Sequence, residues 1–500
     1  MPTRERYESV AREIARYLAS RQQPDGGFPG RESYGVAMAL WLWSDLGDEF
    51  ARNAEMATRR LESHPPEGHG EFNAYALLQC RAGAGAEFAD GMLRRIRFGR
   101  RHSANWMLLR AVCRSHRDHR VSVARARLEA RAALTRSMRL GFIADRGGVR
   151  SFGYHCFCGA LLADLWRRRG YPWAAAAAAQ AAEFISQFIP PNGDALYVGR
   201  GQEQIFGYGA LLYLLEAAGE MTGNVGFRHD AARVFGHLLS FQRDDGSFPL
   251  VLREGEYPEP WRDGPRPGWY SYNRYGDYLP FLACMLLRAA RPQMPLYGAA
   301  PSPPPHPDFR MHRGTRYVAV LSRPGGATTN DLAFPYVCVD GVSLLPCYGV
   351  EGSAPPEGMP LPFGVLADGS HYAFRDRLHY RLTDEGLIGE SALARHSRAF
   401  DFQGDGFACR DEITFRQARS FSEFVPANFL FRNLKPAEEG GYETWYQGAR
   451  ASVHVDMPAA ILPDACANAS GRLVGLQCRL GRLQVTAGEV VAVATRVEFL

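Results

Sequence analysis

Up to about residue 293, apolar side chains recur every three or four positions. That spacing places them on one face of an α-helix, so it predicts a series of amphipathic helices. Turns rich in Gly and Asp separate these stretches, as expected where helices end. The clearest predicted helices are residues 7–22, 121–138, 174–189, 206–221 and 228–242.

The pattern changes at RPQMPLYGAAPSPPPHPDF, residues 291–309, which contains too much proline for a helix. After it, apolar residues alternate or run in short β-rich segments, which are 316–322, 336–345, 371–383, 407–415 and 482–500. Such segments with Gly, Asp and Pro between them are typical of antiparallel sheets. We therefore predict a helical domain over residues 1–293, a linker over 294–308 and an antiparallel β-sandwich over 309–500.

The turns of the helical part resemble one another. QQPDGGFP at 22–29 returns as QRDDGSFP at 242–249, and each closes a predicted helix. Weaker copies are PEGHGEF at 66–72, DRGGVRSF at 145–152 and PNGDALY at 191–197. Several intervals are close to fifty residues, and periodicity of that length is typical of repeat architectures. We predict an incomplete (α/α)6-type toroid. Helix termination by glycine explains any single turn, but not their shared composition.

Composition narrows the class of protein. A chain of 500 residues exceeds one ordinary core, so two or more domains are expected. The net charge of +5 suits an anionic ligand, and no nucleic-acid motif is recognisable. The ten cysteines lack the paired spacing of a zinc site, which favours reduced thiols and no metal. No cofactor is expected, and nothing in the sequence indicates an oligomeric state.

No apolar run is long enough to predict a membrane span. The first residues, MPTRERYESVAREIARYLAS, carry charges throughout and lack the apolar centre of a secretion signal. The expected location is therefore the cytoplasm, or the periplasm or cell exterior if a leader has been removed.

Four polar clusters lie at predicted turns, where the rim of a toroid surrounds its cleft. The first is Asn105–Trp106 at the start of an apolar helix, where asparagine also suits the N-cap position. The second is Tyr154–His155, where a helix begins just after the glycines of DRGGVR. A lone histidine beside an apolar face is more often structural, so both interpretations stay open.

The third and fourth clusters are denser. In VGRGQEQ, two glycines flank Arg200, and Gln202 and Gln204 follow, which makes a compact hydrogen-bonding array. In GWYSYNRYGDY, aromatic and amide side chains either pack under the next helix or stack on sugar rings. Its candidates for substrate binding are Tyr270, Tyr272, Asn273 and Tyr275.

Asparagine, histidine, arginine and tyrosine together suit β-elimination at a uronic acid. Removing the proton next to the uronate carboxylate requires that carboxylate to be neutralised, which asparagine, neutral histidine and arginine can do as donors. A tyrosine whose pKa is lowered by Arg or His can take the proton or protonate the departing oxygen. The predicted catalytic residues are Asn105, Tyr154, His155, Arg200 and Tyr272, and the predicted substrate-binding residues are Trp106, Gln202, Gln204, Tyr270, Asn273 and Tyr275.

A helical toroid followed by an antiparallel β-sandwich resembles the polysaccharide lyases of the heparinase II/III, alginate lyase and chondroitin/hyaluronate lyase kind. The chondroitin/hyaluronate branch has, in order, an Asn–Trp pair, a Gly-containing turn leading to a His, and a Gly-Arg segment. Asn105–Trp106, His155 and Arg200 follow that order here. The resemblance implies a lyase whose partner is an acidic polysaccharide or oligosaccharide.

The sequence departs from that branch at the catalytic tyrosine. The branch places this tyrosine shortly after the histidine, where the chain has CFCGALLADL and no tyrosine. Tyr154 precedes the histidine, as in some heparinase-like members, and is the first candidate to replace it. Tyr272 and Tyr275 are the rival candidates.

Two other classes stay open. A glycoside hydrolase on the same toroid needs two carboxylates with room for water between them. The turns supply six candidates without singling out a pair, namely Asp25, Glu71, Asp145, Asp194, Glu203 and Asp245. A non-catalytic glycan-binding protein would keep the fold without the chemistry. In each class the expected partner is a glycan, and neither nucleic acid nor a membrane is expected.

Overall fold

The computed structural model describes residues 4–66, 68–80, 86–117, 119–145, 148–253, 260–261, 269–270, 272–291, 304–325, 331–346, 356–438, 440–468 and 471–500. The chain forms two compact units. The first comprises Met1–Ile189 and Gly201–Pro304, and the second comprises Pro190–Arg200 and Pro305–Leu500. The predicted linker, 294–308, lies outside the described residues up to residue 303.

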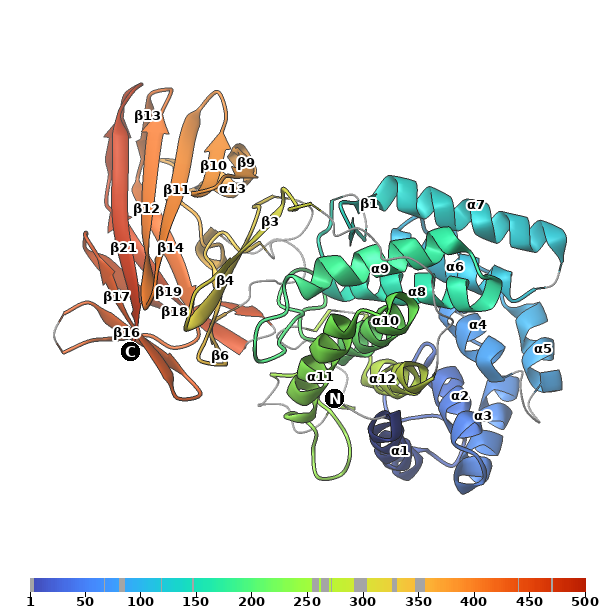
Figure 1. Cartoon of the computed structure of the whole chain (residues 1–500). Coiled ribbons are helices and arrows are strands. Elements are labelled where there is room, and N and C mark those ends of the chain that lie inside the picture. Colours follow the sequence, from blue (N-terminus) through green and yellow to red (C-terminus); the bar gives the residue numbers. More distant parts are fainter. Residues whose placement is uncertain are drawn as a thin grey trace. The chain divides into compact units, whose positions relative to one another are not determined.

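Besides one short antiparallel pair of strands, β1 (Met138–Arg139) and β2 (Phe142–Ile143), the first unit consists mainly of helices (Figure 1). Those of the described part are α1 (Arg4–Arg21), α2 (Gly35–Leu46), α3 (Ala51–Ser63), α4 (Gly70–Gln79), α5 (Ala86–Arg95), α6 (Ala104–Ser115), α7 (Arg120–Ser137), α8 (Phe152–Arg169), α9 (Pro172–Ser186), α10 (Ile205–Thr222), α11 (Val225–Leu239) and α12 (Tyr275–Ala290). The five helices predicted from periodicity are confirmed, and α7 and α10 agree to within one residue at each end. Within the described ranges, no helix is both long and apolar enough to cross a membrane.

The even-numbered helices form a closed inner ring. Each contacts the next, from α2 through α4, α6, α8 and α10 to α12, and α12 contacts α2. The inner helices are buried almost all round, as in α8, where every residue from Phe152 to Trp166 is buried. The odd-numbered helices keep a polar face, and α7 buries only Ala126, Ala130 and Ala133. The predicted incompleteness of the toroid is therefore wrong, because the contact between α12 and α2 closes the ring.

All six inner helices begin at the same end of the ring, because each is separated from the next by an antiparallel outer helix. Contacts between α12 and α2 show how closely these ends approach. Oδ1 of Asp277 accepts hydrogen bonds from the backbone N–H groups of Ser33, Tyr34 and Gly35 at 2.8, 2.8 and 2.7 Å. A Cβ atom on Gly35 would lie 1.9 Å from the carbonyl oxygen of Gly276. Only glycine fits this contact.

Deeper in the ring, a buried ion pair and two tyrosine hydroxyl groups that hydrogen-bond to it connect four inner helices. Arg288 of α12 pairs with Asp164 of α8, and Asp164 also accepts hydrogen bonds from Tyr75 of α4 and Tyr213 of α10. All four side chains are buried. An uncompensated charge in this place would cost several kcal/mol, so the network holds the four helices in one arrangement.

The second unit is built from strands (Figure 1), and every strand pair found in its described residues is antiparallel. The strands are β3 (Phe309–Arg313), β4 (Tyr317–Ser322), β5 (Tyr336–Val339), β6 (Val342–Leu345), β7 (Phe363–Val365), β8 (His371–Ala373), β9 (His379–Leu382), β10 (Gly386–Glu390), β11 (Ala394–Gln403), β12 (Gly406–Phe415), β13 (Arg419–Phe421), β14 (Glu423–Phe431), β15 (Lys435–Pro436), β16 (Tyr442–Tyr446), β17 (Ala449–Val455), β18 (Ala459–Asn468), β19 (Gly471–Leu480), β20 (Leu483–Val485) and β21 (Val490–Phe499).

Two large sheets share an apolar core. One has eight strands in the order β15-β16-β17-β21-β12-β11-β10-β9, and the other has five in the order β18-β19-β14-β7-β8. Phe415 of the first sheet and Phe424 of the second belong to one buried cluster, with ring centroids 5.6 Å apart. The antiparallel β character predicted for this part is confirmed. One predicted segment differs, because the short helix α13 (Phe374–Arg377) interrupts residues 371–383 between β8 and β9.

A fully buried charged network lies on β9, β11 and β12. Asp411 accepts from His396 Nε2 at 2.7 Å and from Arg398 Nε at 2.7 Å. Tyr380 Oη lies 2.9 Å from Nδ1 of the same histidine. The side chains of His396, Arg398 and Asp411 are at most 1% exposed. Burial lowers the pKa of His396, and the adjacent Arg398 and His396 lower the pKa of Asp411 despite burial, so the network is built around one carboxylate and one guanidinium.

The segment Pro190–Arg200, between α9 and α10, belongs to the second unit. Asp194, which is fully buried, accepts hydrogen bonds from Tyr336 Oη and Ser343 Oγ, both at 2.7 Å. Tyr197 stacks on Tyr336 with ring centroids 3.9 Å apart. The chain thus enters the β unit before the helical unit is complete, which helical periodicity does not predict.

Candidate functional site

Five aromatic side chains gather where the inner helices begin. They are Tyr34 before α2, His69 before α4, Trp106 in α6, Tyr154 in α8 and Tyr272 before α12, and we call them the mouth cluster. The rings of Tyr34 and His69 are 5.8 Å apart, and those of His69 and Trp106 are 5.7 Å apart. The hydroxyl oxygens of Tyr154 and Tyr272 are 3.4 Å apart. Residues separated by more than two hundred positions therefore meet at one end of the ring.

The electrostatics of this end favour an anion. Each helix carries a partial positive charge at its amino end, where backbone N–H groups lack helical partners. Six inner helices begin here. Two arginines, Arg101 and Arg274, add full positive charges close enough to lower the pKa of His69. A carboxylate or sulfate at the mouth would be stabilised by all of these groups.

The Tyr154–Tyr272 pair was predicted as catalytic, and the structure brings its two hydroxyl groups together. Ser151 caps α8 and accepts a hydrogen bond from the backbone N–H of Tyr154 at 3.3 Å. Tyr154 is 8% exposed, with its ring packed near Phe206 at 5.9 Å. Tyr272 is half-buried and stacks on Tyr270 with centroids 5.5 Å apart. At 3.4 Å the contact is longer than the usual length of about 2.5–3.0 Å for a hydroxyl–hydroxyl hydrogen bond, but it places the two hydroxyl groups side by side.

Tyr34 supplies a third hydroxyl group. Burial raises its pKa well above the usual value, and the neighbouring Asp277, Tyr154 and Tyr272 raise it further. The phenol of Tyr34 therefore keeps its proton at neutral pH. Its ring stacks on Phe72 at 4.5 Å, which holds the side chain in place. Tyr34 therefore places a protonated hydroxyl group near the tyrosine pair.

His69 is neutral at physiological pH. Burial lowers its pKa, and Arg101 and Arg274 lower it further because they repel a second positive charge. Its backbone has a φ of 50°, in the left-handed region that a histidine adopts only where its surroundings impose it. Together with Trp106, it lines a hollow of about 410 Å³. A neutral imidazole in this place can donate or accept a proton.

Replacing Arg101 with Gln should raise the pKa of His69, because it removes one positive charge from near the imidazole. A proton NMR titration of His69 measures this directly. The matched control is Arg52→Gln, an exposed arginine of α3 without an ion pair in the described chain, which should leave the titration unchanged. Identical titrations of all three proteins would show that Arg101 has no influence on this histidine.

Asn105 lies at the mouth with one amide donor available. Its Oδ1 accepts from Ser103 Oγ at 2.5 Å and from the backbone N–H of Trp106 at 2.8 Å. Because a backbone N–H can only donate, the second bond fixes which amide atom is oxygen. Within the described residues, Nδ2 makes no hydrogen bond. The predicted role of Asn105 as a donor is therefore compatible with its position, and it stays a prediction.

Several predicted substrate-binding residues support the loop before α12 instead. Oδ1 of Asn273 accepts from Gln204 Nε2 at 2.7 Å and from the backbone N–H of Tyr270 at 2.6 Å, while its Nδ2 donates to Tyr278 Oη at 2.7 Å. Asn273 and Gln204 are at most 2% exposed, and Gln202 is 3% exposed. These bonds hold the backbone of Tyr270, so Gln204 and Asn273 are corrected from substrate contacts to supporting residues, and the predicted role of Gln202 stays a prediction.

His155 is part of the core, and the prediction that it lines the cleft is wrong. It is fully buried, Nδ1 accepts from the backbone N–H of Ile143 at 3.0 Å, and Nε2 donates to the carbonyl of Ala181 at 3.0 Å. Its ring packs against Phe142 and Phe184. Successive helical residues point about 100° apart. When Tyr154 faces the mouth, its neighbour must therefore face the outer helices.

Two further predicted residues are placed elsewhere. Tyr275 is 3% exposed and donates to the carbonyl of Phe248 at 2.6 Å, so it is corrected to a packing residue. Arg200 ends the segment Pro190–Arg200 and is described with the second unit. Its predicted contact with a substrate carboxylate stays a prediction.

Tyr34, His69 and Arg274 were missed by sequence reasoning. His69 lies in PEGHGEF, one of the repeated turns, so its position at the rim could have been inferred. Arg274 lies inside the recognised aromatic segment before α12. Tyr34 had no local signal, since RESYGVAMAL resembles any helix start. Only closure of the ring between α2 and α12 brings it to the others.

The six carboxylates considered for a hydrolase show no isolated pair. Three of them form ion pairs with arginine, which are Asp25 with Arg60, Glu71 with Arg110 and Glu203 with Arg253. Asp245 accepts from the backbone N–H of Ser247 at 3.0 Å, Asp145 is 2% exposed, and Asp194 lies in the second unit. A different carboxylate, Glu32, has its pKa raised to about 7 by burial, with Asp277 contributing. Glu32 lines a hollow of about 480 Å³ together with Tyr34.

No protein-family model matches the sequence, and a search of curated proteins finds no match either. Among solved structures, cellobiose 2-epimerase from Bacillus thermoamylovorans B4167 is similar, with 11% identity and a TM-score of 0.46 over 56% of this chain and 99% of that chain. A glycosyl hydrolase family 88 protein from Bacteroides vulgatus has 10% identity and a TM-score of 0.43 over 58% and 99%. A polysaccharide lyase has 10% identity and a TM-score of 0.43 over 57% and 96%. Likenesses at this level do not assign a reaction.

Proposed function

We propose that this protein is a glycan-processing enzyme that cleaves a uronic-acid-containing polysaccharide or oligosaccharide by β-elimination at the mouth cluster. The observation that supports this proposal most directly is the pair of tyrosine hydroxyls 3.4 Å apart, with Tyr34 as a third hydroxyl group nearby. β-Elimination needs one group to take a proton and another to give one, and tyrosine can do both.

The uronate carboxylate binds where positive charge is concentrated. The Nδ2 amide of Asn105 is a hydrogen-bond donor there, and Arg101 and Arg274 contribute positive charge. Neutralising the carboxylate stabilises the charge that develops when the adjacent carbon loses its proton. Trp106 and Tyr270 offer aromatic faces on which sugar rings stack.

In the proposed reaction, the phenolate of the Tyr154–Tyr272 pair takes the proton from the carbon next to the carboxylate. The second hydroxyl of the pair, 3.4 Å away, lies beside the group that takes the proton. The electron pair of the broken C–H bond forms a C=C bond, and the bond to the glycosidic oxygen breaks. Tyr34, which stays protonated, gives its proton to that oxygen. Proton transfer among the three hydroxyls then restores the starting state.

A panel of acidic glycans tests the proposal. Polygalacturonate, alginate, hyaluronan and heparin are each incubated with the protein, and neutral dextran serves as the control. Both the ultraviolet absorbance of an unsaturated uronate and the number of new reducing ends should rise together for one acidic glycan. Reducing ends without the absorbance would indicate hydrolysis, and neither signal from any glycan would contradict both reactions.

Hydrolysis is the second candidate, and Glu32 is the observation that favours it. With a pKa of about 7, this carboxyl group holds its proton for much of the time at neutral pH, as a general acid must. Asp277, with its pKa raised to about 6 by burial, is one of the carboxyl groups that influence Glu32, but its Oδ1 already accepts three backbone hydrogen bonds. Glu32→Gln should abolish activity in a hydrolase and have little effect on a tyrosine-dependent lyase.

A further inference from the structure

Positive charge is concentrated in one tenth of the chain. Residues 91–140 contain fourteen arginines and only two acidic residues, Asp118 and Glu129, which gives a net charge of +12. The whole chain carries +5, so all the other residues together sum to −7. This uneven distribution exceeds what an overall excess of arginine would produce by itself.

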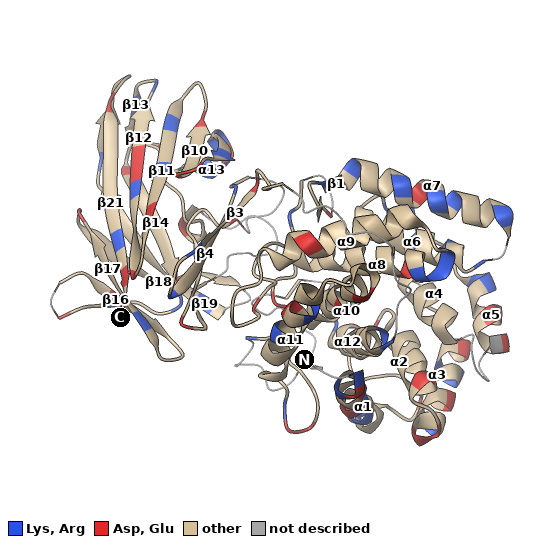
Figure 2. Cartoon of the chain, in the orientation of Figure 1, with Lys and Arg blue, Asp and Glu red and all other residues tan. Residues whose placement is uncertain are grey.

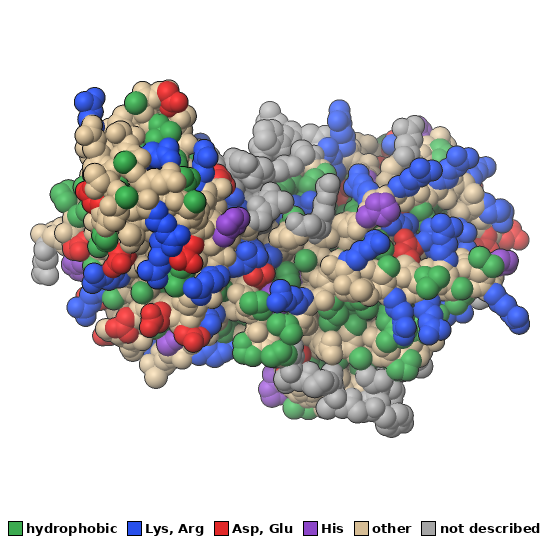
Figure 3. All heavy atoms as spheres, turned by 90° about the horizontal axis from the view of Figure 1, so that it is seen from above, with side chains coloured by type: hydrophobic (Ala, Val, Ile, Leu, Met, Phe, Trp, Pro, Cys, Tyr) green, Lys and Arg blue, Asp and Glu red, His purple; other side chains and the backbone are tan. Residues whose placement is uncertain are grey.

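These arginines lie on the outer surface of the helical unit. They extend from the end of α5, through the connection to α6, to the exposed side of α7, where Figure 2 shows basic residues along the helix. Figure 3 shows many arginine side chains on the surface of the helical unit. The exposed arginines of residues 91–140 form what we call the basic track, which consists of Arg94, Arg95, Arg97, Arg100, Arg101, Arg117, Arg120, Arg125, Arg127, Arg131, Arg136 and Arg139.

The arginines of the basic track are not used for ion pairs in the described structure. Of the fourteen in residues 91–140, only Arg110 and Arg114 pair with a carboxylate, which Glu71 or Glu129 provides. Three others lie over aromatic rings, namely Arg101 over Trp106 at 4.6 Å, Arg117 over Phe98 at 5.9 Å and Arg131 over Trp173 at 5.4 Å. Unpaired like charges repel one another, which destabilises the fold unless an anionic ligand uses them.

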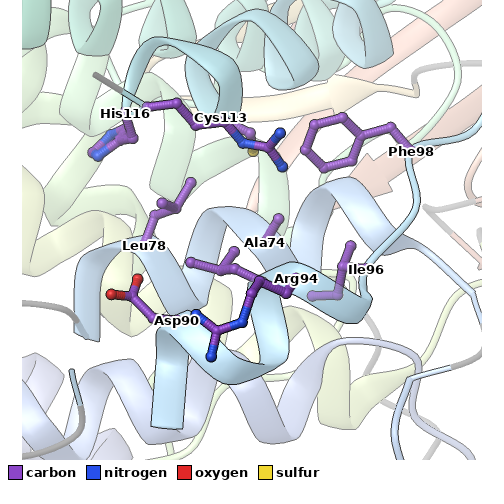
Figure 4. Close-up of a pocket in the computed structure, with 10 residues that line it drawn as sticks. Ala74, Leu78, Asp90, Arg94, Ile96, Phe98, Cys113 and His116 are labelled. Atoms are coloured by element: carbon purple, nitrogen blue, oxygen red, sulfur yellow. The ribbon is translucent and has the colours of Figure 1, made fainter. Parts of the chain in front are cut away.

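Two hollows connect the basic track with the mouth cluster. The hollow of about 410 Å³ that contains His69 and Trp106 is also lined by Arg95, Arg97 and Arg101. A second hollow, of about 650 Å³, is lined by residues that include Arg94, Phe98, His116 and Arg117 (Figure 4). Ile96 lines both hollows, so they lie on either side of the same short segment. Positively charged side chains therefore extend from the mouth cluster, past the segment that contains Ile96, towards α7.

We propose that the basic track binds the part of a linear, polyanionic glycan that extends beyond the cleaved bond. This inference rests on the proposed function, because it assigns the substrate class to a long acidic chain instead of a short oligosaccharide. A repeating carboxylate or sulfate is the ligand that a row of unpaired guanidinium groups fits. Binding far from the reacting bond increases the local concentration of substrate and holds it for repeated cleavage.

A glycan fits these observations better than a nucleic acid. Proteins that bind single-stranded nucleic acids stack bases on exposed aromatic rings. Here, guanidinium groups already lie over the rings of Phe98 and Trp173. The track also begins at the hollow that contains His69 and Trp106, where a glycan is proposed to react.

The test is a binding measurement on the full chain with fluorescently labelled polygalacturonate in low salt. The track variant carries Arg125→Gln, Arg127→Gln and Arg131→Gln on α7. The control variant carries Arg52→Gln, Arg381→Gln and Arg482→Gln, which removes the same charge from exposed arginines elsewhere. The track variant should bind about tenfold more weakly and with a shallower dependence on salt. The control variant should bind within about twofold of the wild type, and circular dichroism checks that both are folded.

Several outcomes would overturn the inference. Equal weakening of both variants would show that only net charge matters. Tight binding of single-stranded DNA that depends on the track, without binding of polygalacturonate, would assign the surface to nucleic acid. Because turnover is not needed, this result is separable from the proposed reaction. Track-dependent binding with no unsaturated product would keep the binding surface and refute the β-elimination.

Discussion

Tyr154→Phe should lower kcat by ~10²–10⁴-fold, the usual contribution of a general acid or base, without unfolding the protein. The substitution removes one hydroxyl group and keeps the ring, which packs near Phe206. It also removes the hydroxyl group that lies 3.4 Å from that of Tyr272, so the pair that takes the proton is no longer complete. Tyr272→Phe should have a loss of the same order. The double variant should be little worse than either single variant, since groups that act as a unit are not additive.

Tyr275→Phe is the matched control for that experiment. Tyr275 lies near the same helix start, but its hydroxyl donates to a backbone carbonyl in the core. Its loss should reduce the free energy of unfolding by about 1 kcal/mol and leave kcat close to the wild type. Rates and thermal melting are measured for all four proteins. Near-normal activity of both Tyr154→Phe and Tyr272→Phe would refute the tyrosine mechanism and favour hydrolysis through Glu32.

Asp411→Asn should reduce the free energy of unfolding of the β unit by about 3–5 kcal/mol, the usual cost of leaving a buried charge without its partner. The substitution keeps the side-chain shape and removes the charge that compensates Arg398. The reduction in the free energy of unfolding is measured in the full chain from urea unfolding, monitored by hydrogen exchange of the β11 and β12 amides. Asp401→Asn, on the exposed end of β11, should change it by less than about 0.5 kcal/mol. Similar losses for the two variants would show that the buried network adds no special stability.

The same network makes stability depend on pH. Burial lowers the pKa of His396 below 6.5 in the folded chain. The stability that depends on the neutral imidazole is therefore lost as the pH falls from 6.5, the pKa in the unfolded chain, through the lower pKa in the folded chain. The pKa of Asp411 is also lowered, and its contribution, present above 3.8, is lost at still lower pH. The β unit should therefore weaken as the pH falls below 6.5. His396→Gln should remove the part of this pH dependence that lies closest to pH 6.5.

The local pattern of apolar and polar residues was sufficient to predict much of the secondary structure of the helical unit. The boundaries of α7 and α10 follow from the spacing of apolar residues, because a helix buries one face and that face repeats every 3.6 residues. Two of the repeated turns, at 66–72 and 145–152, also marked the amino ends of inner helices α4 and α8, where His69 and Tyr154 lie. Position along the chain is enough for such inferences, since hydrogen bonding and capping act over only a few residues.

The tertiary structure decided in which direction each side chain points and which residues lie close together. Tyr154 and His155 are adjacent in sequence, yet one faces the mouth and the other hydrogen-bonds to the backbone of Ile143 and Ala181, because helical rotation separates their side chains. The composition of a turn predicts that its residues lie at the rim of the ring. It does not predict which of their side chains points towards the inside of the ring.

The sequence by itself determined the helical first part, the antiparallel second part and the turns at which chemistry could be placed. It did not determine that Tyr34, Tyr154 and Tyr272 share one mouth, or that α2 closes on α12 through Asp277. The physical reason is that secondary structure follows from interactions within a few residues, whereas the site depends on packing of helices more than two hundred residues apart. That packing sets which side chains lose contact with water, and so which pKa values shift and which groups can react.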